Sequence, residues 1–266
     1  ISVDMGGTSY DVCLVRGGRP QITSSWNWHH RYLVGLPMVD VQSVGAGGGS
    51  IASVVEGALH VGPESSGAQP GPICYRRGGT RPTVTDANLA LGYLNPDYFY
   101  GGELSLDLEG VQRAIDEQIR RPLGLGSVEE AAYGIFRMVN ANMANAIRRV
   151  SATRGVDPRE LPLVAFGGNG AVHAGMQARE LDIKQVLVPK TAPTFSALGL
   201  LLTDPVVIEL RSYITPAKDA DLARVTALCA EMRESATASL LAGGFPAREI
   251  QHQRVAYMCY PGQTFD

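Results

Sequence analysis

Two aspartates flank a run of glycine and hydroxyl residues near the start of the 266-residue chain, in the stretch VDMGGTSYDV. Short apolar segments on either side predict two strands joined by a tight turn, with positive φ at Gly6 and Gly7. In that hairpin Asp4 would hydrogen-bond its own backbone, as turn aspartates commonly do. One interpretation of the stretch is therefore purely structural.

The same turn could instead bind phosphate. A turn without Cβ atoms lets backbone N–H groups approach phosphate oxygens, and neighbouring hydroxyls add donors. Asp4 and Asp11 could then hold a hydrated Mg²⁺ ion, because carboxylate oxygens suit this cation. The candidate phosphate contacts are Gly6, Gly7, Thr8 and Ser9.

A second glycine turn lies in VAFGGNGAVHA, after an apolar strand and before a helix. A nucleotide can bind in this setting, because the helix N-terminus favours negative charge. The G-x-G-x-x-G spacing is absent, as is an acidic residue about 20 positions later, which disfavours a dinucleotide fold. Gly167, Gly168 and Gly170 are the candidate contacts, and close helix–strand packing is the alternative.

Two further features, a glycine-rich stretch and a histidine, have both a functional and a structural interpretation. The stretch GAGGGS, with Gly45, Gly47, Gly48, Gly49 and Ser50, could border a phosphate or be a flexible packing loop. His173, one turn into the helix after GGNG, could face the site or pack between helix and sheet.

The Gly- and Pro-rich segment over residues 63–82 predicts a loop, and its apolar Ile73, Cys74 and Tyr75 favour an ordered one. Glu64 near Asp86 could place substrate or metal there, with a solvated loop charge as the alternative.

The elements that would position these residues follow in a clear order: an antiparallel meander, a crossover, a long helix and a βαβ unit. IASVV after the glycine loop could begin a helix, and Thr85 or Asp86 could cap a short one. The longest helix should begin at the Ser127 and Glu130 capping box and end near Gly155. The order predicts an α/β domain with a mixed sheet.

Composition narrows the function classes. The chain is 45% hydrophobic and 18% charged, with net charge -3 and a sequence pI near 6.0, so we expect a globular protein without a nucleic-acid partner. No apolar run could span a bilayer and no signal peptide precedes the first strand, so we expect a cytoplasmic location. Four widely spaced cysteines suggest reduced thiols and no zinc site. His29 and His30 beside two tryptophans suggest a strand surface or an interface.

The chain resembles the hydantoinase/oxoprolinase A family, within the actin, hexokinase and Hsp70-type ATPase superfamily. Matching motifs run in family order from Asp4 to Asp204. They are VDMGGTSYDV, VGAGGGSIA, VGPESSGAQPGPICY, PTVTDANLALG, RGVDPRELPLVAFGGNGAVHA and FSALGLLLTD. The terminal YPGQ resembles another family segment, with Cys259 where arginine is usual.

The resemblance implies an ATP-dependent amidohydrolase whose A-type half binds ATP and Mg²⁺ and phosphorylates a carbonyl or enolate oxygen, while a B-type partner completes the reaction. By position, residues 6–9 and the two aspartates would bind phosphate and Mg²⁺, and Gly167, Gly168 and Gly170 would contact adenosine. Substrates in the family are cyclic amides such as hydantoin, 5-oxoproline or lactams, and ketones in the related carboxylases. A non-catalytic nucleotide-binding scaffold is the alternative from another class.

The resemblance also implies domain boundaries. Residues 1–215 would form the second lobe of an actin-like (ribonuclease H-like) ATPase, with helices on both faces of its sheet, and residues 216–266 a helix and the start of a β segment. A first lobe with its own phosphate hairpin would lie upstream. Both ends fall in strand-like sequence, so we expect a fragment of a longer protein with an incomplete active site.

Overall fold

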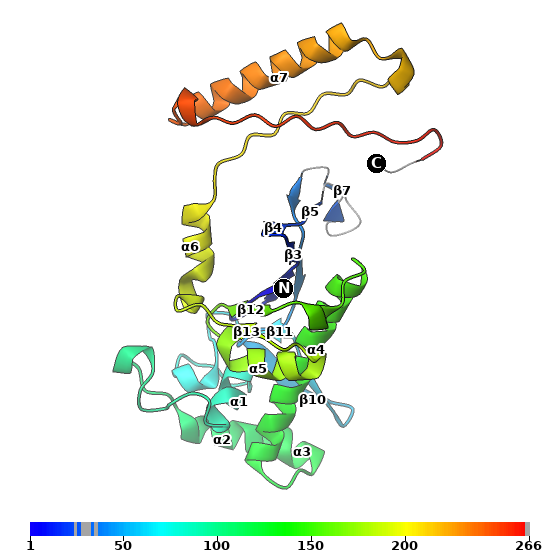
Figure 1. Cartoon of the computed structure of the whole chain (residues 1–266). Coiled ribbons are helices and arrows are strands. Elements are labelled where there is room, and N and C mark those ends of the chain that lie inside the picture. The colour runs from blue at the N-terminus through cyan, green and yellow to red at the C-terminus, as the bar shows by residue number, and fades with distance from the viewer. Residues whose placement is uncertain (24–25, 28–32, 35–36, 264–266) are drawn as a thin grey trace. The chain divides into compact units, whose positions relative to one another are not determined.

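The structure is a computed structural model that describes residues 1–23, 26–27, 33–34 and 37–263 (Figure 1). The described part of the chain divides into two compact units, Ile1–Leu201 and Leu202–Asp266. The predicted division into domains after residue 215 stays a prediction. His29 and His30 lie outside the described residues.

Within the described residues, a five-stranded mixed sheet forms the centre of the first unit, in the order β13-β12-β1-β2-β9. β1 and β12 pair in parallel, as do β12 and β13, whereas β2 runs antiparallel to both β1 and β9. This mixture of an antiparallel meander and a βαβ unit confirms the predicted mixed α/β sheet. The strands are β1 (Ser2–Met5), β2 (Tyr10–Cys13), β9 (Val41–Val44), β12 (Leu163–Phe166) and β13 (Val186–Leu187).

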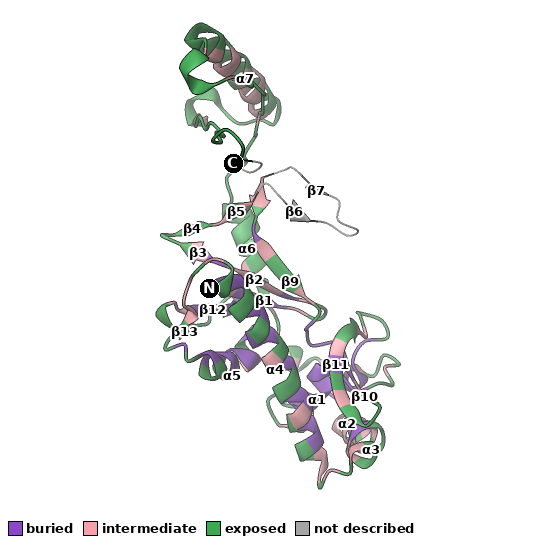
Figure 2. Cartoon of the chain, turned by 90° about the vertical axis from the view of Figure 1, so that its right-hand side faces the viewer, coloured by how far each residue is buried: buried purple, intermediate pink, exposed green. Residues whose placement is uncertain are grey.

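One face of the sheet is buried under two helices, α4 (Val128–Ala152) and α5 (Gly170–Leu181). Residues alternate between the faces along a strand, so Val3, Met5, Tyr10 and Val12 all point into this core. The hydroxyl of Tyr10 donates a 2.5 Å hydrogen bond to Gln177 Oε1 on α5. The alternate residues, which include both candidate aspartates, are only partly buried (Figure 2).

Helix α4 begins where the sequence predicts. Ser127 is its N-cap, and the Ser127 side chain accepts a 3.1 Å hydrogen bond from the backbone N–H of Glu130. The Glu130 carboxylate accepts from the N–H of Gly126, one residue before the cap. Gly155 follows the helix with φ of +62°, as the αL position requires.

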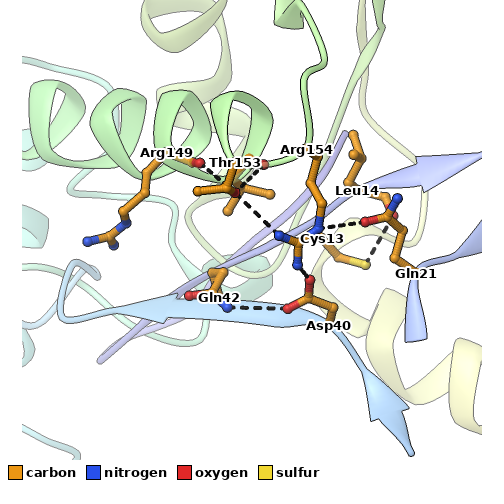
Figure 3. A network of polar contacts seen from close by, with 9 residues as sticks. Cys13, Leu14, Gln21, Asp40, Gln42, Arg149, Thr153 and Arg154 are labelled. Atoms are coloured by element: carbon orange, nitrogen blue, oxygen red, sulfur yellow. Dashed lines mark hydrogen bonds and ion pairs between the residues drawn. The ribbon is translucent and has the colours of Figure 1, made fainter. Parts of the chain in front are cut away.

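The C-terminal end of α4 is tied to the sheet by a polar network (Figure 3). Arg154 forms an ion pair with Asp40, which is 7% exposed, and donates through Nε to Gln21 Oε1 at 2.8 Å. Gln42 in β9 donates to Asp40 Oδ1 at 3.2 Å. The pairing supplies the buried carboxylate with a countercharge and fixes the helix end beside β9.

The segment after the glycine loop is a strand, so its interpretation as a helix start is wrong. β10 (Ser50–Val55) and β11 (Ala58–Ser65) form an antiparallel hairpin in which Ala52 opposes Val61. Glu56 and Gly57 both have positive φ, a geometry that two-residue hairpin turns need. β-branched Ile51, Val54 and Val55 favour the extended form.

A group of helices follows this hairpin. The N-cap of α1 (Val84–Ala90) is Thr83, in a capping box with Asp86, so the predicted cap at Thr85 or Asp86 is wrong by two to three positions. Next come α2 (Leu108–Ile115) and α3 (Arg121–Leu123). Short strands complete the first unit, namely β3 (Val15–Arg16), β4 (Arg19–Pro20), β5 (Ile22–Thr23), β6 (Trp26–Asn27), β7 (Leu33–Val34) and β8 (Met38–Val39).

The end of the first unit carries α6 (Phe195–Leu202), whose Phe195 ring lies 5.0 Å from the Phe166 ring of β12. In the second unit, α7 (Leu222–Ala242) has no buried residue and is drawn in the exposed and intermediate colours of Figure 2. Among the described residues, no helix combines the length and the apolarity that crossing a bilayer requires.

Candidate functional site

The Gly-Gly-Thr-Ser turn between β1 and β2 is the first part of the site. The N–H of Gly6 donates to the carbonyl of Ser9 at 3.2 Å, which closes the hairpin. Neither Gly6 nor Gly7 has positive φ, so that prediction is wrong. Gly7 and Thr8 are exposed, and among the described residues no hydrogen bond uses the N–H of either. The turn therefore presents free amide donors.

The glycine loop after β9 lies against this turn. The N–H of Gly48 donates to Gly6 O at 3.0 Å, and that of Gly49 to Gly7 O at 2.6 Å. Gly47 and Gly48 are buried, and a Cβ atom on Gly47 would lie 2.7 Å from the backbone nitrogen of Thr8. These glycines allow two backbones to touch. The direct nucleotide contact predicted for Gly47 and Gly48 stays a prediction.

The GGNG turn between β12 and α5 completes the junction. Gly167 has φ of +82°, and a Cβ atom there would overlap the Asp4 carboxylate. Asn169 donates twice to the hairpin strand, from its N–H to Met5 O at 3.0 Å and from Nδ2 to Gly6 O at 3.3 Å. The structure thus brings together three glycine turns that are far apart in the sequence.

Gly6, Gly7 and Gly168 differ from the other glycines of the junction. None of the three has positive φ, and a Cβ atom on each would meet no protein atom within 4 Å. Neither backbone conformation nor packing within the described residues requires glycine at these positions. Their missing side chains leave open space at the ends of β1 and β12, beside the N-terminus of the twelve-residue helix α5. Such a space suits an anionic ligand.

Asp4 and Asp11 lie directly opposite each other on β1 and β2. Opposed residues of an antiparallel pair share a face, so both carboxylates point to the partly exposed side of the sheet. Asp4 Oδ2 accepts a 2.7 Å hydrogen bond from Ser196 Oγ, and Asp11 Oδ2 accepts a 3.4 Å one from Ser9 Oγ. No ion pair among the described residues compensates either charge.

This pair fits a hydrated Mg²⁺ ion. Two like charges that face each other are destabilising unless a cation lies between them. Mg²⁺ in nucleotide sites is commonly bound by one or two carboxylates, with water and phosphate oxygens as its other ligands. The described residues contain no group of three or more His, Cys, Asp and Glu that could hold a metal, so phosphate and water would supply the remaining ligands.

Alanine at position 48 tests the junction directly. Its Cβ would overlap the Asn169 side chain and lie 2.6 Å from Thr85 Oγ1. We expect Gly48→Ala to lower stability by about 1–3 kcal/mol, as overpacking does. Gly175→Ala, at an exposed position of α5, is the matched control, because its Cβ meets nothing and helix propensity should improve. Equal thermal midpoints for the two variants would contradict this packing.

His173 is buried, so the interpretation that it packs is confirmed and its facing the site is wrong, but its hydrogen-bonding and ring partners among the described residues lie on α1 and α4 rather than on the sheet. Its ring is fully buried and stacks on Phe136 at a centroid distance of 4.9 Å. Nε2 lies 3.0 Å from the amide of Asn88, and Nδ1 lies 3.0 Å from that of Asn140. Burial lowers the pKa of His173 to about 4.

The lowered pKa predicts acid sensitivity. Unfolded His173 would bind a proton near its ordinary pKa of 6.5, whereas the folded ring stays neutral down to about 4. Its stabilising contribution is therefore complete above pH 6.5 and is lost as the pH falls toward 4, to a total of about 3 kcal/mol. Urea unfolding across this pH range measures the slope. His173→Gln should flatten it, and an unchanged slope would contradict the assignment.

The predicted loop over residues 63–82 begins later than expected, because residues 63–65 belong to β11. The remainder is ordered around Asp86. This carboxylate is fully buried and accepts from the N–H groups of Ile73 and Cys74, at 3.2 and 2.9 Å. It also accepts from Thr83 N–H at 2.9 Å and from Thr83 Oγ1 at 2.8 Å. Burial raises the pKa of Asp86, and these donors oppose that effect. Glu64 is exposed and pairs with Arg81, so neither carboxylate joins the glycine turns.

Sequence reasoning missed the residues that connect the turns. Asn169 bridges to Gly6, Thr85 donates from N–H and Oγ1 to Gly48 O at 2.8 Å, and Ser196 binds Asp4. All three lie inside motifs that resemble the family, which was the available signal. Their partners are distant in the sequence, so spacing alone could not pair them.

The fold and the junction define a class: an α/β domain whose glycine turns meet, with two carboxylates, at the ends of adjacent strands, as in nucleotide-binding proteins. The Hydantoinase/oxoprolinase family model matches residues 1–209. The chain belongs to the hydantoinase/oxoprolinase family.

Individual relatives agree with this assignment. Caprolactamase subunit alpha of Pseudomonas jessenii is 44% identical over 270 residues, which cover 100% of this chain and 38% of that protein. The solved structure of the ATP-dependent caprolactamase from the same organism superposes with a TM-score of 0.71 at 42% identity, covering 92% of this chain and 36% of that one.

A nucleotide-free acetone carboxylase structure, from a study of ATP-dependent acetone carboxylation, is also similar. It gives a TM-score of 0.77 at 32% identity, covering 93% of this chain and 36% of that one. The chain therefore spans less than two fifths of the length of each of these relatives.

Proposed function

We propose that the chain is the ATP-binding lobe of an ATP-dependent cyclic amide hydrolase of the hydantoinase/oxoprolinase type. The observation that supports this most directly is the set of glycines at positions 6, 7 and 168, which have no structural reason to be glycine and surround open space. Similarity to an ATP-dependent caprolactamase points to ATP as the ligand and to a lactam or related cyclic amide as the substrate.

In this proposal the glycine turns bind the nucleotide and the two aspartates bind the metal ion. The amides of Gly7 and Thr8, with the hydroxyls of Thr8 and Ser9, donate to phosphate oxygens, and Gly167, Gly168 and Gly170 lie along the nucleoside. Asp4 and Asp11 hold Mg²⁺ through water and so orient the terminal phosphate. Mg·ATP, when bound, supplies the phosphoryl group and a cation that offsets charge on it.

Phosphorylation explains why such a reaction would use ATP. An amide carbonyl resists attack by water, whereas an O-phosphorylated amide is a far better electrophile. The lobe's part would be to hold the terminal phosphate in line with the carbonyl oxygen, because phosphoryl transfer depends mainly on positioning and charge stabilisation.

The proposal includes partners. We expect the lobe to be the second of an actin-like ATPase, working with a first lobe that carries its own phosphate hairpin, and with a B-type subunit that completes hydrolysis. The short span relative to the relatives and the subunit name of the caprolactamase protein support this arrangement.

A ketone carboxylase subunit is the second candidate, favoured by the similarity to acetone carboxylase. The full-length protein with its B-type partner would be assayed for ATP consumption dependent on a lactam, hydantoin or 5-oxoproline, and separately on a ketone with bicarbonate. Calorimetry with Mg·ATP tests the shared step. Absence of nucleotide binding by the full-length protein would overturn both candidates, and binding without substrate-dependent turnover would favour the scaffold role.

A further inference from the structure

His173 joins three helices at one buried point. It lies on α5, Asn88 on α1 and Asn140 on α4, and all three side chains are fully buried. Each ring nitrogen is 3.0 Å from one asparagine amide. Within the described part of the chain, the ring contacts Asn88, Asn140 and Phe136, none of which is charged. We refer to His173, Asn88 and Asn140 as the polar pin.

The hydrogen-bond partners of the ring determine which of its two nitrogens carries the proton. A neutral imidazole has one donor and one acceptor nitrogen. Nδ2 of Asn140 lies 2.7 Å from the carbonyl of Phe136, which can only accept, so the amide nitrogen of Asn140 must stay where it is. The same NH₂ group faces Nδ1 of His173, so Nδ1 accepts. The proton is therefore on Nε2.

The Asn88 amide must then present an acceptor to Nε2. In the structure Nδ2 of Asn88 lies 3.0 Å from Nε2. The nitrogen and oxygen of an amide exchange places when the group rotates by half a turn, and the Asn88 oxygen has no other partner among the described residues, so we assign the oxygen to the position that faces the ring N–H. A cationic ring would need acceptors on both sides, and Asn140 offers none. The arrangement holds His173 neutral in a single tautomer.

The polar pin lies one helical turn behind the glycine junction. Helix α5 starts at Gly170, directly after the GGNG turn, and His173 is in its first turn. Helix α1 carries Thr85, whose N–H and Oγ1 both donate to Gly48 O at 2.8 Å. Linking α1 to α5 thus fixes the Gly48 loop relative to Asn169. The N–H of Gly48 and Nδ2 of Asn169 both donate to the carbonyl of Gly6 in the hairpin turn.

We propose that His173, as the neutral ring protonated on Nε2, is a positioning residue that keeps the glycine junction in register for nucleotide binding. This rests on the proposed function, since the ligand in question is Mg·ATP. The ring itself does not touch the ligand space. It acts through α1 and α5.

The test compares two buried polar residues of the same helix. Gln177, one turn further along α5, accepts from Tyr10 of the sheet and donates to Met143 of α4, and none of its hydrogen bonds within the described residues reaches α1. In the full-length protein, His173→Leu should weaken Mg·ATP binding roughly tenfold, whereas Gln177→Leu should leave it within about twofold while lowering the thermal midpoint. His173→Gln, which restores a donor toward Asn88, should recover part of the affinity.

Equal affinity of His173→Leu and wild type, or equal losses in both leucine variants, would overturn the positioning role. The effect should appear in the KM for ATP more than in kcat. Histidine ring ¹⁵N chemical shifts of the full-length protein, assigned with His173→Gln, test the tautomer independently. A proton on Nδ1 would contradict it. If wild type binds no Mg·ATP, the proposed function fails, while the ring spectrum still tests the polar pin.

Discussion

Asp11→Asn in the full-length protein is expected to lower ATP turnover at least about 100-fold, the size of loss seen when one charge-stabilising group of an active site is removed. The amide keeps the shape of the carboxylate but carries no charge for Mg²⁺. Turnover would be measured as phosphate release in the presence of substrate and the B-type partner.

Stability should change in the opposite direction. Asp4 and Asp11 face each other without a countercharge among the described residues, so neutralising one removes a repulsion. We expect the thermal midpoint of Asp11→Asn without nucleotide to equal or exceed that of wild type. Exposed Asp97 provides a matched control, and Asp97→Asn should alter neither property. Full turnover by Asp11→Asn would remove this aspartate from the candidate site.

Asp86→Ala is expected to cost about 3–5 kcal/mol of stability. The carboxylate accepts three backbone N–H groups and one hydroxyl while fully buried. Its removal leaves those donors without an acceptor and out of reach of water, at about 1–3 kcal/mol for a group that stays unpaired. Removal also relieves the cost of burying the carboxylate, which keeps the expected net loss below the sum over all four donors. Urea unfolding, monitored by circular dichroism, measures the loss.

Glu64→Ala is the contrasting variant, because its carboxylate pairs with Arg81 at 2.6 Å but is exposed. Surface pairs contribute about 0–1 kcal/mol, so this change should be nearly neutral. Asp86→Asn should fall between the two, since one acceptor oxygen remains. A similar effect for Asp86→Ala and Glu64→Ala would show that the loop over residues 63–82 does not depend on the buried carboxylate.

Local patterns made much of the fold predictable. Alternation of buried and partly exposed residues in β1 and β2 follows from the two-residue period of a strand. The apolar run LPLVAF predicts the strand that is β12, in which buried and partly exposed residues also alternate. The cap at Ser127 is a short-range signature with its own hydrogen bond. In each case the residues that determine the structure are neighbours in the sequence.

Predictions were wrong where contacts outside the segment decide its structure. IASVV is interpreted from the sequence as a helix start, although its β-branched residues favour a strand, and its pairing with β11 settles the extended form. The Gly-Gly turn reads as a positive-φ turn, but these glycines leave space for a ligand instead. Short apolar runs and glycines occur in several kinds of structure, and the contacts that select among them are not visible in the run itself.

The candidate site could be predicted as separate pieces but not as an assembly. Its glycine turns are visible as motifs, whereas Asn169 Nδ2 meets Gly6 O across a separation of 163 residues, and Ser196 meets Asp4 across 192. No local pattern encodes such pairs. Motif order within the family was the only indication that they belong together.

The parallel pairing of β1 with β12 has a kinetic consequence. β1, β2 and β9 can associate early, because short connections cost little loop entropy, but β12 must close a loop that contains most of the first unit. The ligand space therefore exists only once the last of these strands has docked. We therefore expect nucleotide to bind only after β12 has docked, and not to an early folding intermediate. Ligand should then lower the rate constant of unfolding and leave the rate constant of folding unchanged.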